Sequence, residues 1–261
     1  ALTRIKIDNM REEHQEKLIK DSERLAAQQK AEEEAKEKKE EPRKKYGFIA
    51  VSVGEGLSEI FKGIGADYII EGGQTMNPST EDMLEAIEKV HAETVYILPN
   101  NKNIILAAEQ VKKLLGAAQV DYVPTTNLAQ GLAALLHFDA AKTLQENSAV
   151  MRREAKEAHS AAVSIAVRDS VVNGITVKKG QYIGLLEDKI VYAGATLEEV
   201  TAETVKLAGS DWELISLYYG SDLTQSEADK IAAELEALDG GWEVTVFDGG
   251  QPLYPLLLSL E

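Results

Sequence analysis

The chain has 261 residues, no cysteine and a formal net charge of −16 at pH 7. The lack of cysteine excludes disulfides and thiolate metal ligands within it, and the excess of carboxylates disfavours nucleic acid as a partner because it repels phosphate. No apolar run approaches the roughly 20 residues of a membrane-spanning helix, and charged residues stand where a signal peptide would need an apolar core. We therefore expect a cytoplasmic protein without a transmembrane segment.

The first 45 residues differ from the rest in composition. Residues 1–10 alternate apolar and polar residues like a strand with no visible partner. Residues 11–45 contain eleven Lys or Arg, eleven Asp or Glu and no glycine, which predicts a charged helical linker that ends at Pro42. A coiled coil is the alternative, although the apolar heptad pattern does not persist.

From Tyr46 onward, short apolar strands alternate with amphipathic helices. Strands are predicted at 47–53, 68–70, 94–98 and 120–123. The helices between and after them are predicted at 57–64, 79–90, 104–115 and 128–136. This order predicts an α/β fold with a mainly parallel sheet. The loops 72–78, 99–103 and 124–127 follow strands, so they are expected to form the binding edge of that sheet.

A second α/β pattern follows a helix predicted near 143–159. Its strands are predicted at 162–169, 175–177, 182–186, 189–192, 212–219, 242–247 and near 256–258. Thr196 with Glu199, and Thr224 with Glu227, have the spacing of capping boxes that begin helices. We therefore predict two α/β subdomains, 46–140 and 141–261, preceded by the charged helix or linker.

The run Glu71–Asp82 combines a turn, a polar cluster and the start of a helix. Its two glycines follow an apolar strand and allow positive φ. Asn77 is predicted to be the N-cap and Pro78 the first helical residue. This loop is expected to be held at both ends, with its polar side chains at one edge of the domain.

Common catalytic signatures are absent from the sequence. It contains no GxxxxGK[ST] phosphate loop, dinucleotide GxGxxG, HExxH or GxSxG. The four histidines are far apart, and none has a second histidine at metal-ligand spacing. We predict no catalytic residue and no metal site in this chain.

Polar side chains nevertheless gather at predicted strand ends. Asn100, Asn101 and Lys102 precede a helix, where they either attract an anion to its positive end or serve only the turn. Arg168 and Asp169 end an apolar strand as a buried ion pair or an exposed docking pair. Residues 248–255 are predicted to form a tight connection, with Tyr254 packing across it.

Five irregular strings resemble a known family when taken in order. They are GGQTMNPSTED, LPNNKNI, VPTTNLAQGLAAL, IAVRDS and DGGQPLYPLLLSLE. They resemble the C-terminal region of the dihydroxyacetone-kinase-like family that includes the large subunit of bacterial fatty acid kinase, and the similarity extends over nearly the whole chain from Tyr46. IKIDNMREEH resembles the junction after the middle domain of these proteins, so residues 1–10 are predicted to be the end of that domain.

The resemblance implies a non-catalytic fragment that docks a DegV-family fatty-acid-binding protein. The absent N-terminal domain, with ATP and magnesium, would phosphorylate the fatty acid carboxylate to an acyl phosphate for phospholipid synthesis, and no cofactor is expected in this fragment. The residues predicted to contact the partner are Gln74, Thr75, Asn77, Asn100, Asn101, Lys102 and Arg168. The alternatives are a small-anion or phosphate-binding domain built on 72–77 and 100–102, and a module for homodimer formation.

Overall fold

The computed structural model describes residues 42–73, 76–209, 212–238 and 241–261. The chain divides into two compact units, residues 1–44 and 45–261. Apart from Arg43 and its neighbours at the boundary, everything described below belongs to the second unit. The strand predicted at 1–10 and all but the end of the charged linker lie outside the described residues.

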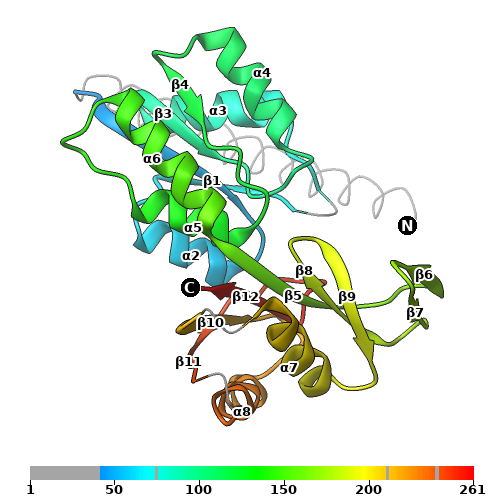
Figure 1. Ribbon diagram of the computed structural model, residues 1–261. Coiled ribbons are helices and arrows are strands. Elements are labelled where there is room, and N and C mark those ends of the chain that lie inside the picture. Colours follow the sequence, from blue (N-terminus) through cyan, green and yellow to red (C-terminus); the bar gives the residue numbers. More distant parts are fainter. Residues whose placement is uncertain (1–41, 74–75, 210–211, 239–240) are drawn as a thin grey trace, which may run out of the picture. The chain divides into compact units, whose positions relative to one another are not determined.

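The first half of this unit is built on a parallel sheet, as predicted. Its strand order is β2-β1-β3-β4, and Figure 1 shows these strands in blue to green. The strands are β1 (Lys44–Ser52), β2 (Tyr68–Glu71), β3 (Ala92–Leu98) and β4 (Val120–Tyr122). The helices are α2 (Glu55–Gly63), α3 (Thr80–Val90), α4 (Ile105–Leu115), α5 (Leu128–Leu136) and α6 (Leu144–Glu157).

Alternation along β1 assigns these helices to the two faces of the sheet. Phe48 and Ala50 belong to one buried cluster, which includes residues of α2, α5 and α6. Ile49 and Val51 belong to another, with residues of α3 and α4. Because both faces are covered, β1 is a continuous apolar run rather than an alternating one.

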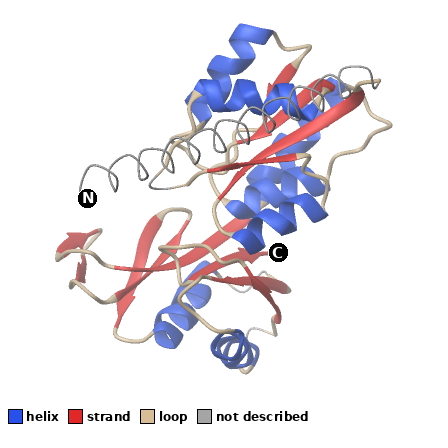
Figure 2. Ribbon diagram, turned by 180° about the vertical axis from the view of Figure 1, so that it is seen from behind, coloured by secondary structure: helices blue, strands red, loops and turns tan. Residues whose placement is uncertain are grey.

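The second half is built on a six-stranded sheet with the order β11-β10-β12-β5-β8-β9. Its strands are β5 (His159–Ile165), β8 (Tyr182–Leu186), β9 (Lys189–Gly194), β10 (Leu214–Tyr219), β11 (Glu243–Asp248) and β12 (Leu256–Leu260). Only β10 and β11 pair in parallel. Helices α7 (Leu197–Ala208) and α8 (Gln225–Glu236) supply apolar residues to the buried cluster on one face. Figure 2 shows these two helices against the lower sheet, from behind.

The opposite face of the six-stranded sheet carries a row of cross-strand neighbours. Leu185 pairs with Ala162, Ala162 with Leu257, and Leu257 with Tyr218. Tyr218 and Leu257 pack in the same cluster as α2 and α5, and α5 lies against both β5 and β12. The two sheets therefore share a core. The division that the sequence predicted near residue 140 falls in the connection between α5 and α6.

A small hairpin follows β5. It consists of β6 (Ser170–Val172) and β7 (Ile175–Val177), which form a separate two-stranded sheet (Figure 1). The strand β7 was predicted, but β6 was not. The predicted strand 162–169 begins and ends earlier, as β5. Ala166 N still donates to Gln181 O at 2.9 Å, and bends at Val167 and Arg168 then end the strand before the hairpin.

Helix starts correct one prediction and refine another. The N-cap of α3 is Ser79, whose hydroxyl accepts from Asp82 N while the Asp82 carboxylate accepts from Ser79 N. Asn77 is therefore not the cap, and Pro78 is not in the helix. Thr224 with Glu227 forms the predicted capping box. At α7 the Thr196 hydroxyl accepts from Glu199 N, but the Glu199 carboxylate bonds to Tyr192 and Ala195 instead.

Candidate functional site

The three loops expected at the carboxyl edge of the parallel sheet line one cavity with residues of the six-stranded sheet. Gly72 and Gly73 come from the first loop, Asn100 and Asn101 from the second, and Thr126 and Asn127 from the third. The cavity has a volume of about 120 Å³. Such a position is the usual one for ligand sites in open α/β sheets.

Asn100 connects the loops at this edge of the sheet through hydrogen bonds. Its side-chain amide donates to Val51 O at 3.0 Å, and its backbone amide donates to Thr125 Oγ1 at 3.0 Å. Thr125 Oγ1 in turn donates to Asn100 Oδ1 at 2.8 Å. Asn100 adopts φ of 53°, a conformation that asparagine tolerates better than most residues. These bonds fix the ends of three strands relative to one another.

Asn101 is also turned inward. It is buried, and its Oδ1 accepts from Asn103 N at 2.9 Å. The two asparagines thus complete the turn before α4 and leave little surface for a partner. Whether a partner contacts them stays a prediction.

Several backbone donors in these loops are already bonded within the chain. Asn100 N and Asn103 N bond to side chains, as described above, and Ile104 N donates to Asn101 O. In the first loop, Gly72 N donates to Ser52 O and Gly73 N to Met76 O. These five donors are therefore not available to an anion, and the alternative of an anion site at 72–77 and 100–102 stays a prediction.

The remaining predicted residues are dispersed. Gln74 and Thr75 lie outside the described residues, and Asn77 is exposed. Lys102 is exposed and forms an ion pair with Asp188 at 3.2 Å in the β8–β9 turn. Arg168 is exposed beyond the other end of β5. Since seven residues of a strand extend about 23 Å, Lys102 and Arg168 are at opposite ends of this sheet.

Arg168 and Asp169 do not form a buried ion pair, which corrects one of the two sequence interpretations. Both side chains are exposed. Asp169 accepts from Lys179 N at 2.7 Å and lies 3.7 Å from the Lys178 ammonium. Asp169 therefore stabilises the turn beyond the hairpin, whereas Arg168 is accessible to a partner.

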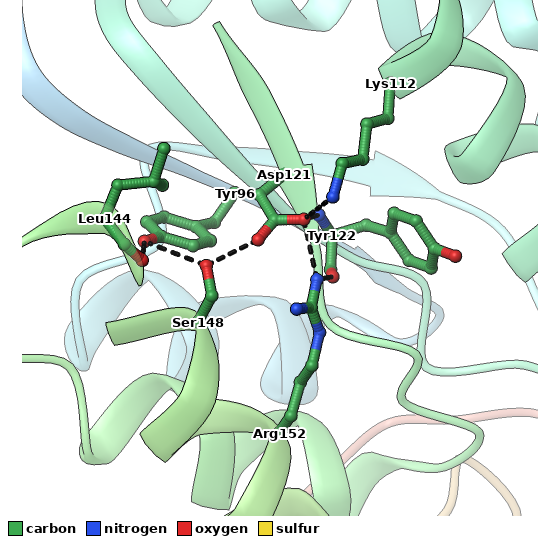
Figure 3. A network of polar contacts seen from close by, with 7 residues as sticks. All are labelled: Tyr96, Lys112, Asp121, Tyr122, Leu144, Ser148 and Arg152. Atoms are coloured by element: carbon green, nitrogen blue, oxygen red, sulfur yellow. Dashed lines mark hydrogen bonds and ion pairs between the residues drawn. The ribbon is translucent and has the colours of Figure 1, made fainter. Parts of the chain in front are cut away.

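The sequence analysis missed a buried carboxylate in the first half, shown in Figure 3. Asp121 lies in β4 and is 4% exposed. Its Oδ1 accepts from Lys112 Nζ and from Arg152 Nη2, each at 2.7 Å, and Oδ2 accepts from the Ser148 hydroxyl. Burial opposes ionisation, but these donors outweigh it and lower the pKa of Asp121. A lone Asp in an apolar strand was the only sequence signal.

The Asp121 cluster has the features of a structural network. It joins β4 to α4 through Lys112 and to α6 through Ser148 and Arg152. Arg152 also donates to Tyr122 O at 2.8 Å. Because both cations are fixed on the same carboxylate oxygen, the network holds the edge strand to its covering helices.

Two buried tyrosines have raised pKa values. Burial raises the pKa of Tyr96 and of Tyr218 to about 12, so both phenols stay protonated. No group of three His, Cys, Asp or Glu side chains that could hold a metal ion occurs in the described part of the chain. Within the same residues, no helix has the length and apolarity needed to span a bilayer.

A family model and sequence relatives both match this chain over most or all of its length. The family model of the FakA-like C-terminal domain of fatty acid kinases matches residues 47–261. Uncharacterized proteins of Staphylococcus aureus strains bovine RF122 / ET3-1 and USA300 are each 38% identical over all 261 residues. The chain spans 45% of the length of these two relatives.

Solved structures show the same fold at low sequence identity. A DegV family protein, Cg2579 of Corynebacterium glutamicum, has a TM-score of 0.60 at 14% identity, covering 83% of this chain and 96% of that one. The fatty acid kinase (Fak) B3 protein of Streptococcus pneumoniae loaded with linoleic acid has a TM-score of 0.58 at 11% identity, covering 83% and 99%. The dihydroxyacetone kinase of C. freundii has a TM-score of 0.54 at 13% identity, covering 85% and 49%.

Proposed function

Because this chain belongs to the family of FakA-like C-terminal domains of fatty acid kinases, we propose that it docks a DegV-family fatty-acid-binding protein. The chain itself is non-catalytic in this proposal. The full-length kinase would use ATP and magnesium, held outside this chain, to phosphorylate the fatty acid carboxylate to an acyl phosphate. Positioning accounts for much of phosphoryl-transfer catalysis, so a dedicated docking domain is a useful component of such an enzyme.

The observation that carries this proposal is a set of exposed apolar side chains at the end of β5, in the hairpin strand β6 that follows it and in the loop before β12. Val167 is 82% exposed and Val171 is 71% exposed. Ile165 and Leu253 are also exposed, and the Ser164 hydroxyl holds Leu253 O at 3.0 Å beside the same strand end. We call these four residues, with Arg168, the β5-end surface. Single exposed apolar residues need no explanation, whereas a local group of them is typical of a protein interface.

Arg168 is the predicted contact residue that belongs to this surface. An arginine among apolar residues is a common hot spot, because its planar guanidinium binds carboxylates and packs on apolar or aromatic groups. Asn77 and Lys102 are exposed as well. Lys102 lies about the length of β5 away from Arg168. An interface that includes both residues must therefore have at least the ordinary size of about 800 Å² on each partner.

Titration calorimetry tests the proposal. The chain is titrated with a fatty-acid-loaded DegV-family protein from the same organism in the absence of ATP. We expect saturable binding, and at least tenfold weaker binding for the double variant Val167→Ser and Val171→Ser. The matched control is Leu114→Ser, since Leu114 is 67% exposed on α4 but lies outside the β5-end surface.

Two results would contradict this function. One is an absence of binding by the unaltered chain. The other is an equal loss of affinity in the Leu114→Ser control, which would mean that the serine variants act through general surface changes. Sedimentation of the chain alone, run in parallel, tests the alternative of a homodimer, for which the molecular mass would be doubled.

A further inference from the structure

The loop before β12 holds a leucine in a backbone conformation that leucine rarely adopts. Leu253 has a φ of 70°, and across it Tyr254 N donates to Pro252 O at 2.9 Å. A hydrogen bond between residues i and i+2 around a positive φ defines a γ-turn that is rare and strained. A bulky side chain makes this conformation still less favourable.

The other non-glycine residues with positive φ in the described part of the chain have a local explanation. They end a helix, are asparagines, or form the turn between β8 and β9: His91, Asn100, Asn173, Glu187 and Asp188. Leu253 has no such explanation. Its side chain is 53% exposed, so burial of the side chain does not offset the strain. An apolar residue that a strained turn holds at the surface indicates a functional role.

Hydrogen bonds hold this turn in place from two sides. The Ser164 hydroxyl of β5 donates to Leu253 O at 3.0 Å. The buried Gln251 donates through Nε2 to Tyr254 O at 3.2 Å and to Tyr218 O at 3.0 Å. The turn is therefore fixed to both β5 and β10. A side chain that is already held in one position loses less conformational entropy when it binds a partner.

We propose that Leu253 is the apolar anchor through which this chain binds its partner, and that it inserts into an apolar pocket of that partner. The inference rests on the docking function proposed above, and it adds the residue that contributes most to binding and the chemistry of the surface that receives it. An aliphatic side chain that fills a pocket, with other apolar residues around it, is a typical centre of a protein interface. Val167 and Val171 of the β5-end surface are such neighbours.

The charges beside this surface indicate the kind of pocket that receives Leu253. Residues 166–181 follow β5 and contain one Arg, two Lys and one Asp, a net charge of +2, whereas the whole chain has −16. Arg168 and Lys179 are exposed. Interfaces bring opposite charges together. The partner's apolar pocket therefore has carboxylates at its rim.

Urea unfolding of two leucine-to-glycine variants tests the strain without any partner. Leu253→Gly removes the steric cost of the positive φ, and we expect the midpoint of unfolding to rise by roughly 0.3 M. Leu207→Gly is the matched control, because Leu207 is 54% exposed and lies in α7. Glycine in a helix is unfavourable, so this variant should have a lower midpoint than the unaltered chain.

Titration calorimetry with a fatty-acid-loaded DegV-family protein from the same organism, without ATP, tests the anchor. We expect Leu253→Gly and Leu253→Ala each to bind at least about tenfold more weakly than the unaltered chain. Leu253→Met keeps an apolar side chain of similar size and should bind within about threefold. Alanine keeps the strain and glycine relieves it, so an equal loss in both assigns the effect to the missing side chain. Leu207→Ala should bind like the unaltered chain.

Charge reversal tests the acidic rim. The double variant Arg168→Glu and Lys179→Glu should bind at least about fivefold more weakly at 50 mM salt, and the difference should shrink to about twofold or less at 500 mM salt. Lys156→Glu, at an exposed position of α6, is the control and should change the affinity little. Unchanged affinity in the double variant would overturn the assignment of an acidic rim.

Three results would overturn the assignment of the anchor. They are a lower midpoint of unfolding for Leu253→Gly than for the unaltered chain, full affinity of Leu253→Ala, and an equal loss of affinity in Leu207→Ala. Binding that depends on Val167 and Val171 but not on Leu253 would refute this inference alone. An absence of binding by the unaltered chain would refute the docking function, and this inference with it.

Discussion

Asn100 and Thr125 hydrogen-bond to each other twice, since Thr125 Oγ1 accepts from Asn100 N at 3.0 Å and donates to Asn100 Oδ1 at 2.8 Å. Thr125 is completely buried. Replacing Thr125 by the similarly shaped valine leaves both Asn100 groups without this partner. We expect Thr125→Val to lower the free energy of unfolding by about 2 kcal/mol, because buried polar groups are then unpaired. Urea unfolding followed by circular dichroism measures this change.

Thr126→Val is the neighbouring control for that experiment. The Thr126 hydroxyl donates to Gln130 at the start of α5, and the residue is only partly buried. We expect a loss of about 1 kcal/mol or less. Equal losses in the two variants would show that the Asn100 pair has no special structural importance.

Gly131 contacts the same asparagine from α5. A Cβ added at Gly131 would lie 2.1 Å from Asn100 Oδ1, a distance that requires one of the two segments to move. Although alanine favours a helix by about 1 kcal/mol over glycine, we expect Gly131→Ala to be destabilising. In an Asn100→Gly background, which lacks the clashing side chain, the same Gly131→Ala substitution should no longer be destabilising, although Asn100→Gly itself loses the bonds to Val51 and Thr125.

A double-mutant cycle checks this steric explanation. The two single variants and the double variant are compared by denaturant unfolding, and a coupling energy of at least about 1 kcal/mol is expected for residues in contact. Additive effects would contradict the contact. Gly63→Ala, at a helical position where an added Cβ meets no atom within 4 Å, is the control for the general effect of alanine.

Asp121→Asn removes the charge at the centre of the network in Figure 3. The variant leaves Lys112 and Arg152 facing a neutral amide, and we expect it to lower the free energy of unfolding by about 2 to 3 kcal/mol. Asp188→Asn is the matched control, because Asp188 and Lys102 form an exposed pair and such pairs contribute less than about 1 kcal/mol. Thermal and urea unfolding at neutral pH give both values.

The same carboxylate should make stability depend on pH in the acid range. The donors around Asp121 lower its pKa in the folded chain, whereas in the unfolded chain it titrates near the ordinary value of about 3.9. Its contribution to stability is present above that value and is lost as the pH falls through the folded pKa. Between pH 5 and 2, stability should therefore fall less steeply for Asp121→Asn than for the unaltered chain or Asp188→Asn.

Substitutions of Ser79, the N-cap of α3, and of Asn77, an exposed residue before it, should differ in their effect on stability. Ser79→Ala removes the hydroxyl that accepts from Asp82 N and should lower the free energy of unfolding by about 1 kcal/mol. Asn77→Ala should leave it nearly unchanged, because Asn77 is exposed and precedes the cap. If Asn77→Ala gave the larger loss in urea unfolding, the position of the cap would be in error.

Local patterns in the sequence predicted most of the elements. The apolar runs at 47–53 and 94–98 and the spacing of Thr224 with Glu227 depend on neighbours within a few residues, so they could be recognised without a fold. The choice between Asn77 and Ser79 could not. Both are good N-caps, and the outcome depends on Pro78, which is buried against Gly72 and so keeps the chain extended before the helix.

Residues that act through distant partners were beyond the reach of sequence patterns. Asp121 meets Lys112, Ser148 and Arg152 only because three separate elements converge, with Arg152 31 residues away. Asn100 was predicted to lie at a sheet edge, which is where it is found, yet its bonds to Val51 and Thr125 bridge 49 and 25 residues. The same polarity that suggests a surface residue also suits a buried connection between loops.

The apolar row formed by Leu185, Ala162, Leu257 and Tyr218 has a consequence for how the chain can be divided. This row faces away from α7 and α8, so the six-stranded sheet depends on α2 and α5 to cover its second face. A shortened chain that begins near residue 140 would expose the row to water and would be prone to aggregate. Residues 45–261 should instead unfold in one cooperative transition, with both halves losing their structure at the same temperature.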